Sequence, residues 1–348
     1  MTSTEYPSPP FAHLARLTDR GGLHEHAEWT RPRAEHGYCL DDVTRALVVI
    51  SRETQPGEKI QALHRQYLRF VLDAQGPDGR FRNRKSTDGV WHGKPCVEDC
   101  WGRGIWAMGS VISGLNAQKT RSAPVQRDLA LGAFERAIRW RSPWLRAMTF
   151  AGLGAAELLG VLPGHHGARA LLLDVVAAVP RPAADPLWPW PEARLTYANA
   201  ALPEVLIAAG ATLHDDVVLA DGLFLLRWLL EHETRGGHLS VTPVGGSGPT
   251  DSAAPRYDQQ PIEVAALSDA CARAFAVTAD PSWAEGVHLA ARWFLGHNDN
   301  GVPLVDPASG GGCDGLEATG RNENQGAEST IALITALQQV RALSLCTA

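Results

Sequence analysis

Five acidic residues occupy positions where a carboxylate must be either paired or used. Each lies at the start of a predominantly apolar stretch, or just before it: Asp42, Asp99, Asp258, Glu263 and Glu328. In GYCLDDVTRALVVI, residues 37–50, the adjacent acids Asp41 and Asp42 precede an apolar run. Burying an unpartnered carboxylate is costly, so we expect these groups to meet in a shared cavity. Two such carboxylates can supply the acid and the base of a hydrolytic reaction.

Polar and aromatic residues accompany these acids. Amides and carboxylates hydrogen-bond sugar hydroxyl groups, and flat aromatic rings pack against the apolar face of a pyranose. The candidate substrate-binding residues are Trp91, His92, Glu98, Trp101, Arg103, Arg146, Tyr197, Asn199, Gln259, Gln260, Asn324 and Gln325. The chain also contains 11 Trp residues. We therefore expect a carbohydrate substrate, with two of the five acids acting on a glycosidic bond.

The elements that must position these residues are helices. Six stretches rich in small apolar residues predict buried helices at 41–52, 98–115, 145–160, 197–210, 258–277 and 324–343. Amphipathic helices alternate with them at 57–74, 126–140, 165–178, 216–232 and 281–295, with a short candidate near 9–18. Short regular alternation indicates stacked helical hairpins. The sequence predicts an all-α (α/α)6 toroid of six inner and six outer helices, with residues 1–348 as one domain. A flatter superhelical stack is the alternative.

In such a toroid the inner helices run in the same direction, so their N-terminal ends share one face. The helix dipoles there favour anionic groups. Asp41, Asp99, Asp258 and Asn324 also suit an N-cap, so we expect Asp41 to cap its helix and Asp42 to face the cavity. The second and fifth inner helices stand opposite one another, which predicts that Asp99 and Asp258 face each other across it.

Composition excludes several classes of partner. The net charge is −6, from 32 Lys and Arg against 38 Asp and Glu, and no basic block predicts binding to nucleic acid or to an anionic membrane. The N-terminus lacks signal-peptide features and no apolar run approaches 18 residues, so we expect a cytoplasmic protein. Cys96 and Cys100 are spaced i, i+4 without a second ligand pair, and we expect free thiols rather than a metal site. No phosphate-binding loop motif is present, and no cofactor is expected.

Three segments carry a resemblance to a known group of proteins. WGRGIWAMG, residues 101–109, resembles the Trp-Gly/Ala-Arg-Gly segment of unsaturated glucuronyl and rhamnogalacturonyl hydrolases. GPDGRFRN (76–83) and YANAALPEVLIAAG (197–210) are similar to segments of sugar-processing toroids. The whole chain thus resembles the six-hairpin (α/α)6 glycosidase-like superfamily, which implies that Trp101 and Arg103 contact substrate. Pro203 is expected either to kink the fourth inner helix or to delay its start, which would hold Tyr197 and Asn199 at the mouth.

Two other functions remain open at this point. N-acylglucosamine 2-epimerases resemble the same architecture and work through histidines, so a sugar epimerase or isomerase is one alternative. No histidine lies in the first turn of a predicted inner helix, although His24, His26, His36 and His92 lie in nearby loops. The other alternative is a non-catalytic carbohydrate-binding accessory module, which would present aromatic platforms without a carboxylate pair.

Overall fold

Two classes of helix alternate along the chain. The computed structural model describes residues 6–117, 123–251 and 254–346, and over these ranges it contains twelve α-helices. The inner helices are α2 (Leu40–Ser51), α4 (Asp99–Ala117), α6 (Leu145–Val161), α8 (Ala201–Leu213), α10 (Pro261–Thr278) and α12 (Ala327–Cys346). The outer helices are α1 (Phe11–Arg16), α3 (Glu58–Ala74), α5 (Ala123–Ala137), α7 (His166–Ala178), α9 (Asp216–His232) and α11 (Pro281–Phe294).

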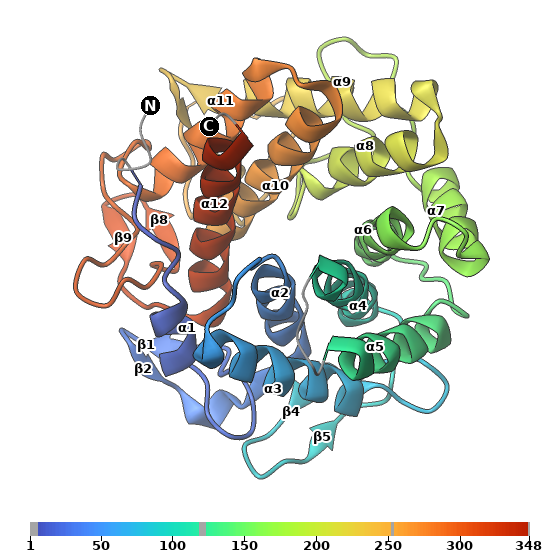
Figure 1. Ribbon diagram of the computed structural model, residues 1–348. Helices are drawn as coiled ribbons and strands as arrows, with labels where there is room; N and C mark the ends of the chain where they lie inside the picture. Colours follow the sequence, from blue (N-terminus) through green and yellow to red (C-terminus); the bar gives the residue numbers. More distant parts are fainter. Residues whose placement is uncertain (1–5, 118–122, 252–253, 347–348) are drawn as a thin grey trace.

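The inner helices form a closed ring. Each packs against the next in the order α2, α4, α6, α8, α10 and α12, and α12 returns to pack against α2 (Figure 1). The outer helices α3, α5, α7, α9 and α11 each pack against the inner helix before them, and α1 packs against α12. The predicted (α/α)6 toroid is confirmed. The flatter stack is wrong, because such a stack would leave α2 and α12 apart.

Short antiparallel strands connect the helices. They are β1 (Ala27–Glu28), β2 (Arg31–Pro32), β3 (Tyr38–Cys39), β4 (Arg84–Lys85), β5 (Trp91–His92), β6 (Thr234–Arg235), β7 (His238–Leu239), β8 (Gly315–Glu317) and β9 (Gly320–Asn322), with a 3-10 turn at Ala34–His36. In one sheet β4 lies between β3 and β5. Since β3 runs directly into α2, this sheet fixes the start of the first inner helix. Within the described residues, no helix has the length and apolar character needed to cross a membrane.

Three inner helices begin later than the sequence pattern predicts. The expected starts at 197, 258 and 324 become Ala201, Pro261 and Ala327. Ala198 has a positive φ of 46°, which is incompatible with a right-handed helix, and Pro203 lies in the first turn of α8, as predicted. Pro261 takes the first position of α10, where its missing N–H leaves no hydrogen bond unmade. The residues before these helices are therefore free to line the end of the ring.

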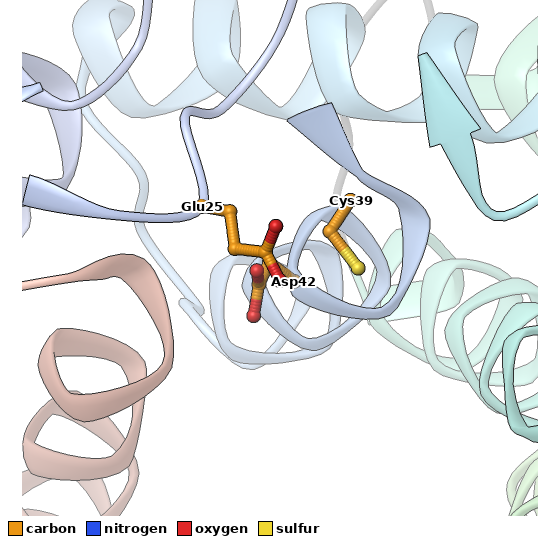
Figure 2. Close-up of side chains that lie close together, drawn as sticks. All are labelled: Glu25, Cys39 and Asp42. Carbon is orange, nitrogen blue, oxygen red and sulfur yellow. The ribbon is translucent and has the colours of Figure 1, made fainter. Parts of the chain in front are cut away.

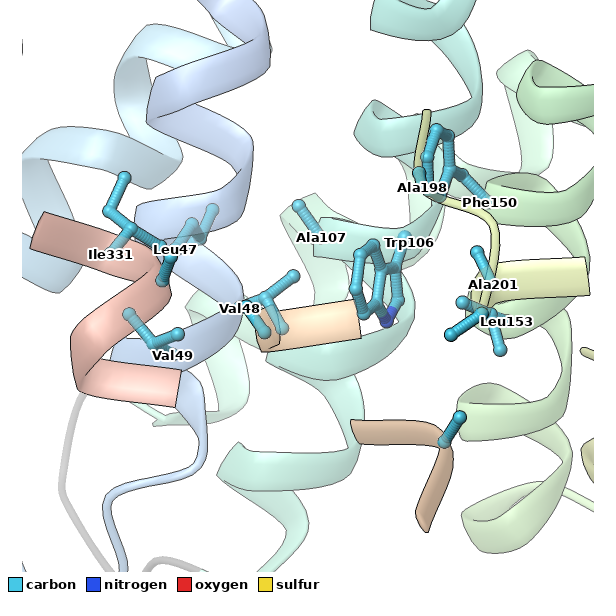
Figure 3. Close-up of a cluster of buried hydrophobic side chains, with 14 of the residues drawn as sticks. Leu47, Val48, Val49, Trp106, Ala107, Phe150, Leu153, Ala198, Ala201 and Ile331 are labelled. Carbon is cyan, nitrogen blue, oxygen red and sulfur yellow. The ribbon is translucent and has the colours of Figure 1, made fainter. Parts of the chain in front are cut away.

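A cavity with an empty volume of about 560 Å³ lies at the centre of the ring, lined by residues of all six inner helices. The apolar part of its lining includes Val48, Trp106, Phe150 and Ile331, which come from four different inner helices (Figure 3). The Trp106 and Phe150 rings stack with centroids 5.9 Å apart. Charged side chains line the same cavity: Arg45, Arg52, Arg103, Glu204, Asp269 and Glu328.

Close backbone contact joins α4 to α6 and makes one glycine sensitive to substitution. A Cβ added at Gly109 would overlap the carbonyl oxygen of Gly154 on the facing helix. We expect Gly109→Ala to lower the free energy of unfolding by about 1–3 kcal/mol, because the helices must separate. Gly160→Ala is the matched control, since a Cβ there meets nothing within 4 Å. Urea denaturation measures both, and equal stability of the two variants would contradict the predicted helix contact.

Candidate active site at the mouth of the ring

A cavity opens where the first turns of consecutive inner helices meet. Its empty volume is about 980 Å³, which is within the range of small-molecule sites. Its lining comes from α2, α4, α6 and the segments around them: Asp41, Asn83, Glu98, Asp99, Cys100, Trp144, Leu145, Arg146, Glu192, Thr196 and Tyr197. We call this the mouth cavity. It contains four acidic side chains and two aromatic rings.

Asp41 is held in this cavity by the sheet that precedes α2. Leu40 N donates to the backbone oxygen of Asn83, and Asn83 Nδ2 donates to Asp41 Oδ2 at 2.9 Å. The expectation that Asp41 caps its helix is wrong, because α2 begins at Leu40 and has no side-chain cap. Asp41 lines the cavity, which is the role predicted for Asp42, and Asp42 does not line it.

Asp99 is the first residue of α4 and lines the same cavity. Burial raises the pKa of its carboxyl group above the ordinary value, and the negative charge of Asp41 raises it further. The Arg103 guanidinium opposes this shift in the pKa of Asp99. Arg103 Nε lies 3.4 Å from Asp41 Oδ1, and its guanidinium packs 4.1 Å from the Phe150 ring centroid. A carboxyl group whose pKa is raised, beside a second carboxylate, is an arrangement suited to acid–base chemistry.

Arg146 organises the part of the cavity wall that includes Glu192 and Tyr197. Its Nε donates to the Tyr197 carbonyl oxygen at 2.8 Å, and its Nη2 donates to Glu192 Oε2 at 2.8 Å. Trp144 and Tyr197 expose aromatic surface, with 59% and 37% of each residue accessible to solvent. The wall therefore combines charged groups with faces on which a sugar ring can pack.

Glu263 positions the segment before α8. Its buried carboxylate accepts hydrogen bonds from the backbone nitrogens of Ala198 and Asn199 and from Asn199 Nδ2. These bonds hold the positive φ of Ala198, a conformation that a residue with a Cβ adopts only when its surroundings stabilise it. Burial raises the pKa of Glu263 to about 7. Glu263 and Asn199 are thus placed to position Tyr197, and neither lines the mouth cavity.

Asp42 and Glu328 share one arginine. Arg45 Nη2 donates to Asp42 Oδ1 at 2.6 Å, and Arg45 Nη1 donates to Glu328 Oε2 at 2.5 Å. The Asp42 side chain is only 3% exposed, whereas that of Glu328 is 41% exposed. The predicted placement of Asp42 in the cavity is wrong, because its carboxylate is used in a buried ion pair.

Asp42 also belongs to the group most similar to a metal site. Ligand atoms of Glu25, Cys39 and Asp42 lie within 4.8 Å of one another (Figure 2). Both carboxylates already have arginine partners, since Arg84 pairs with Glu25 and Arg45 pairs with Asp42. The ion pairs account for this cluster without a metal.

Another group of predicted residues lies on the α10–α12 side of the ring. Asp258 is close to Asp314 and Glu317, and burial raises its pKa. Asp258 and Asn324 are not N-caps, since Gln260 occupies the N-cap position of α10 and α12 begins at Ala327. Asp258 does not line the mouth cavity, whereas Asp41, Glu98 and Glu192 share that cavity with Asp99. The predicted pairing of Asp99 with Asp258 stays a prediction.

The amides predicted on this side have partners within the protein. Gln259 Nε2 donates to Asp299 Oδ2 at 2.6 Å, and Gln325 Nε2 donates to Asp306 Oδ2 at 2.8 Å. Asn324 Oδ1 accepts the Trp29 backbone N–H, and the side chain of Gln260 hydrogen-bonds Asp258. All four therefore take part in holding the loops around the ring.

The predicted aromatic contacts need correction. Trp101 is fully buried, and its Nε1 donates to the Ala137 carbonyl oxygen at 3.1 Å, so it is a core residue. Trp91 donates to Asp73 and packs on Phe70, and neither Trp91 nor its strand neighbour His92 lines the cavity. The WGRG segment therefore brings Arg103, and not Trp101, next to the site.

Several cavity residues were missed by the sequence analysis. They are Asp41, Asn83, Cys100, Trp144, Leu145, Glu192 and Thr196. Trp144 immediately precedes an inner helix, so the rule that identified the acids would also have identified this residue. Asn83 and Glu192 lie in connecting loops whose course the helix pattern does not predict.

Comparison with known proteins extends this description. No family model and no curated protein matches the chain. Among solved structures, a sugar epimerase from a ruminal bacterium has a TM-score of 0.68 at 11% identity, covering 97% of this chain and 96% of that one. Cellobiose 2-epimerase from Spirochaeta thermophila has a TM-score of 0.67 at 12% identity, with 96% and 94% covered. A GH76 alpha-mannanase from Bacteroides thetaiotaomicron has a TM-score of 0.65 at 11% identity, with 97% and 94% covered. The chain shares the (α/α)6 toroid fold of these proteins.

Proposed function

We propose that this protein hydrolyses a glycosidic bond, with Asp99 as the general acid and Asp41 as the general base. One observation carries the proposal: Asp41 and Asp99 line the same open cavity. Aromatic surface and hydrogen-bonding groups lie within the same walls. Paired carboxylates are the common catalytic machinery of glycoside hydrolysis.

In the proposed reaction Asp99 gives its proton to the leaving glycosidic oxygen. Asp41 takes a proton from a water molecule, and the resulting hydroxide forms the new bond to the anomeric carbon as the glycosidic bond breaks. Asn83 and Arg103 orient Asp41. Burial raises the pKa of Asp99, which favours the protonated form that a general acid needs.

The charge of the cavity favours a neutral sugar. Besides Asp99, the proposed acid, the described residues of its lining include three acids (Asp41, Glu98 and Glu192) and one cation, Arg146. An acidic sugar would be repelled by this excess of negative charge. We therefore propose neutral glycosides as substrates.

Epimerisation is the competing activity, since epimerases are among the solved structures with this fold. No histidine lines the mouth cavity in the described part of the chain. His24 is buried and hydrogen-bonded to Asp19. Incubation with neutral oligosaccharides and, separately, with free sugars in deuterated water separates the two activities. New reducing ends support hydrolysis, whereas deuterium incorporated at sugar carbon without cleavage overturns it.

Trp144 provides a separate test of substrate binding. We expect Trp144→Ala to weaken binding of a neutral oligosaccharide about 2–10-fold, because an aromatic face contributes about 0.5–1.5 kcal/mol. Stability should not change, since this side chain is largely exposed. Phe224→Ala is the control, an exposed aromatic on the outer helix α9. Calorimetric titration measures both variants, and unchanged affinity in Trp144→Ala would exclude this contact.

A further inference from the structure

Two thiols meet at the wall of the mouth cavity. Cys96 Sγ and Cys100 Sγ are 3.6 Å apart. Cys96 is paired through its backbone with Phe81, in the segment that leads into α4, and is partly exposed. Cys100 is buried, follows Asp99 in the first turn of α4, and lines the cavity.

The two thiols differ in chemical character. A hydrogen bond from Cys100 lowers the pKa of Cys96 to about 7, and the Glu98 backbone contributes in the same direction. The same hydrogen bond and burial raise the pKa of Cys100 well above the ordinary value. An accessible, acidic thiol beside a buried one has the asymmetry of an attacking and a resolving cysteine.

We propose that Cys96 and Cys100 form a reversible disulfide by exchange with a small-molecule disulfide such as oxidised glutathione. The geometry carries this inference, because the sulfur atoms are already in contact. Closing them from 3.6 Å to the bonding distance of about 2.05 Å requires only a small movement.

The exchange proceeds in two balanced steps. Cys96 thiolate attacks one sulfur of the small disulfide, forming a mixed disulfide and releasing one thiolate. Cys100, after losing its proton to solvent, attacks Cys96 Sγ and releases the second thiolate. The protein loses two electrons and two protons, and the small disulfide is reduced to two thiols.

The disulfide is expected to change the mouth cavity. Asp99 precedes Cys100 directly, so drawing Cys100 towards Cys96 moves the backbone that carries the proposed acid. A displacement of about 1 Å can lower catalysis on the order of 10²-fold. This effect on turnover rests on the proposed function, whereas formation of the disulfide does not.

Mass spectrometry of the full-length protein tests disulfide formation directly. After treatment with oxidised glutathione, we expect the wild type to lose the mass of two hydrogen atoms, with the bond mapped to Cys96 and Cys100 by peptide analysis. Dithiothreitol should restore the reduced mass. Cys100→Ser should retain one glutathione on Cys96, since it lacks the resolving thiol. An unmodified wild type, or a stable glutathione adduct on wild-type Cys96, would overturn the proposal.

A turnover assay tests the link to the cavity. Oxidised wild type should lose at least about tenfold in glycoside turnover, and oxidised Cys96→Ser should keep its full rate. Equal rates for the oxidised and reduced wild type would overturn the link. If no glycoside is cleaved by any form, the proposed function fails while the mass measurement still decides the disulfide.

Discussion

Replacing Asp99 by Asn is expected to lower kcat for a neutral glycoside by about 10²–10⁴-fold, the usual contribution of general acid catalysis. The amide preserves the shape of the side chain but has no acidic proton to give to the leaving oxygen. Because the group acts only in the transition state, kcat and kcat/KM should fall together. Steady-state kinetics measures the loss, and circular dichroism confirms that the variant is folded.

The pH profile gives the same prediction a second readout. Asp99 works only in its protonated form, and burial raises its pKa. The rate should therefore fall as the pH rises through the pKa of Asp99, and this alkaline limb should lie above that of an ordinary aspartic acid. In Asp99→Asn the limb should disappear. An unchanged limb in this variant would assign the acid to another group.

Asp41→Asn is expected to cause the second large loss, also about 10²–10⁴-fold in kcat. An amide cannot take a proton from water, whereas its hydrogen bonding with Asn83 can largely be preserved. The negative charge of Asp41 raises the pKa of Asp99. Without this charge the pKa of Asp99 falls, so the alkaline limb of the residual activity should lie at a lower pH than in the wild type.

Asp174→Asn is the matched control for both variants. Asp174 lies on the outer helix α7, pairs with Arg141, and does not line the mouth cavity. Its substitution should leave the rate and the pH profile unchanged. Activity of Asp41→Asn equal to that of Asp174→Asn would exclude Asp41 as the base.

The fold could be predicted because its signal is distributed along the whole chain. Helices of small apolar residues must be buried on all sides, and their alternation with amphipathic helices leaves few ways to arrange them. Exact starts were less predictable. The delay of α8 depends on Ala198, whose positive φ is stabilised by Glu263, a residue far away in the sequence.

The candidate site could be predicted only in part, for a related reason. Position near a helix start identified Asp99 and Arg146, but it led to the wrong assignment of Asp41 as a cap and of its neighbour Asp42 as the cavity residue. The two acids differ because Asn83 binds the carboxylate of Asp41, whereas Arg45 binds that of Asp42. Trp101 was misassigned because its exposure depends on the outer helices. Its indole N–H donates a hydrogen bond to the carbonyl oxygen of Ala137, at the end of α5.

The central claim is that Asp41 and Asp99 act together on one glycosidic bond. Its most direct test is kcat/KM for the wild type, Asp41→Asn, Asp99→Asn, the double variant and Asp258→Asn on one neutral glycoside. We predict a large fold-loss in kcat/KM for each single variant and near wild-type kcat/KM for Asp258→Asn. The fold-loss in the double variant should be well below the product of the two single fold-losses. Full activity in Asp41→Asn with a large loss in Asp258→Asn would contradict the account and assign the second carboxylate to the opposite side of the ring.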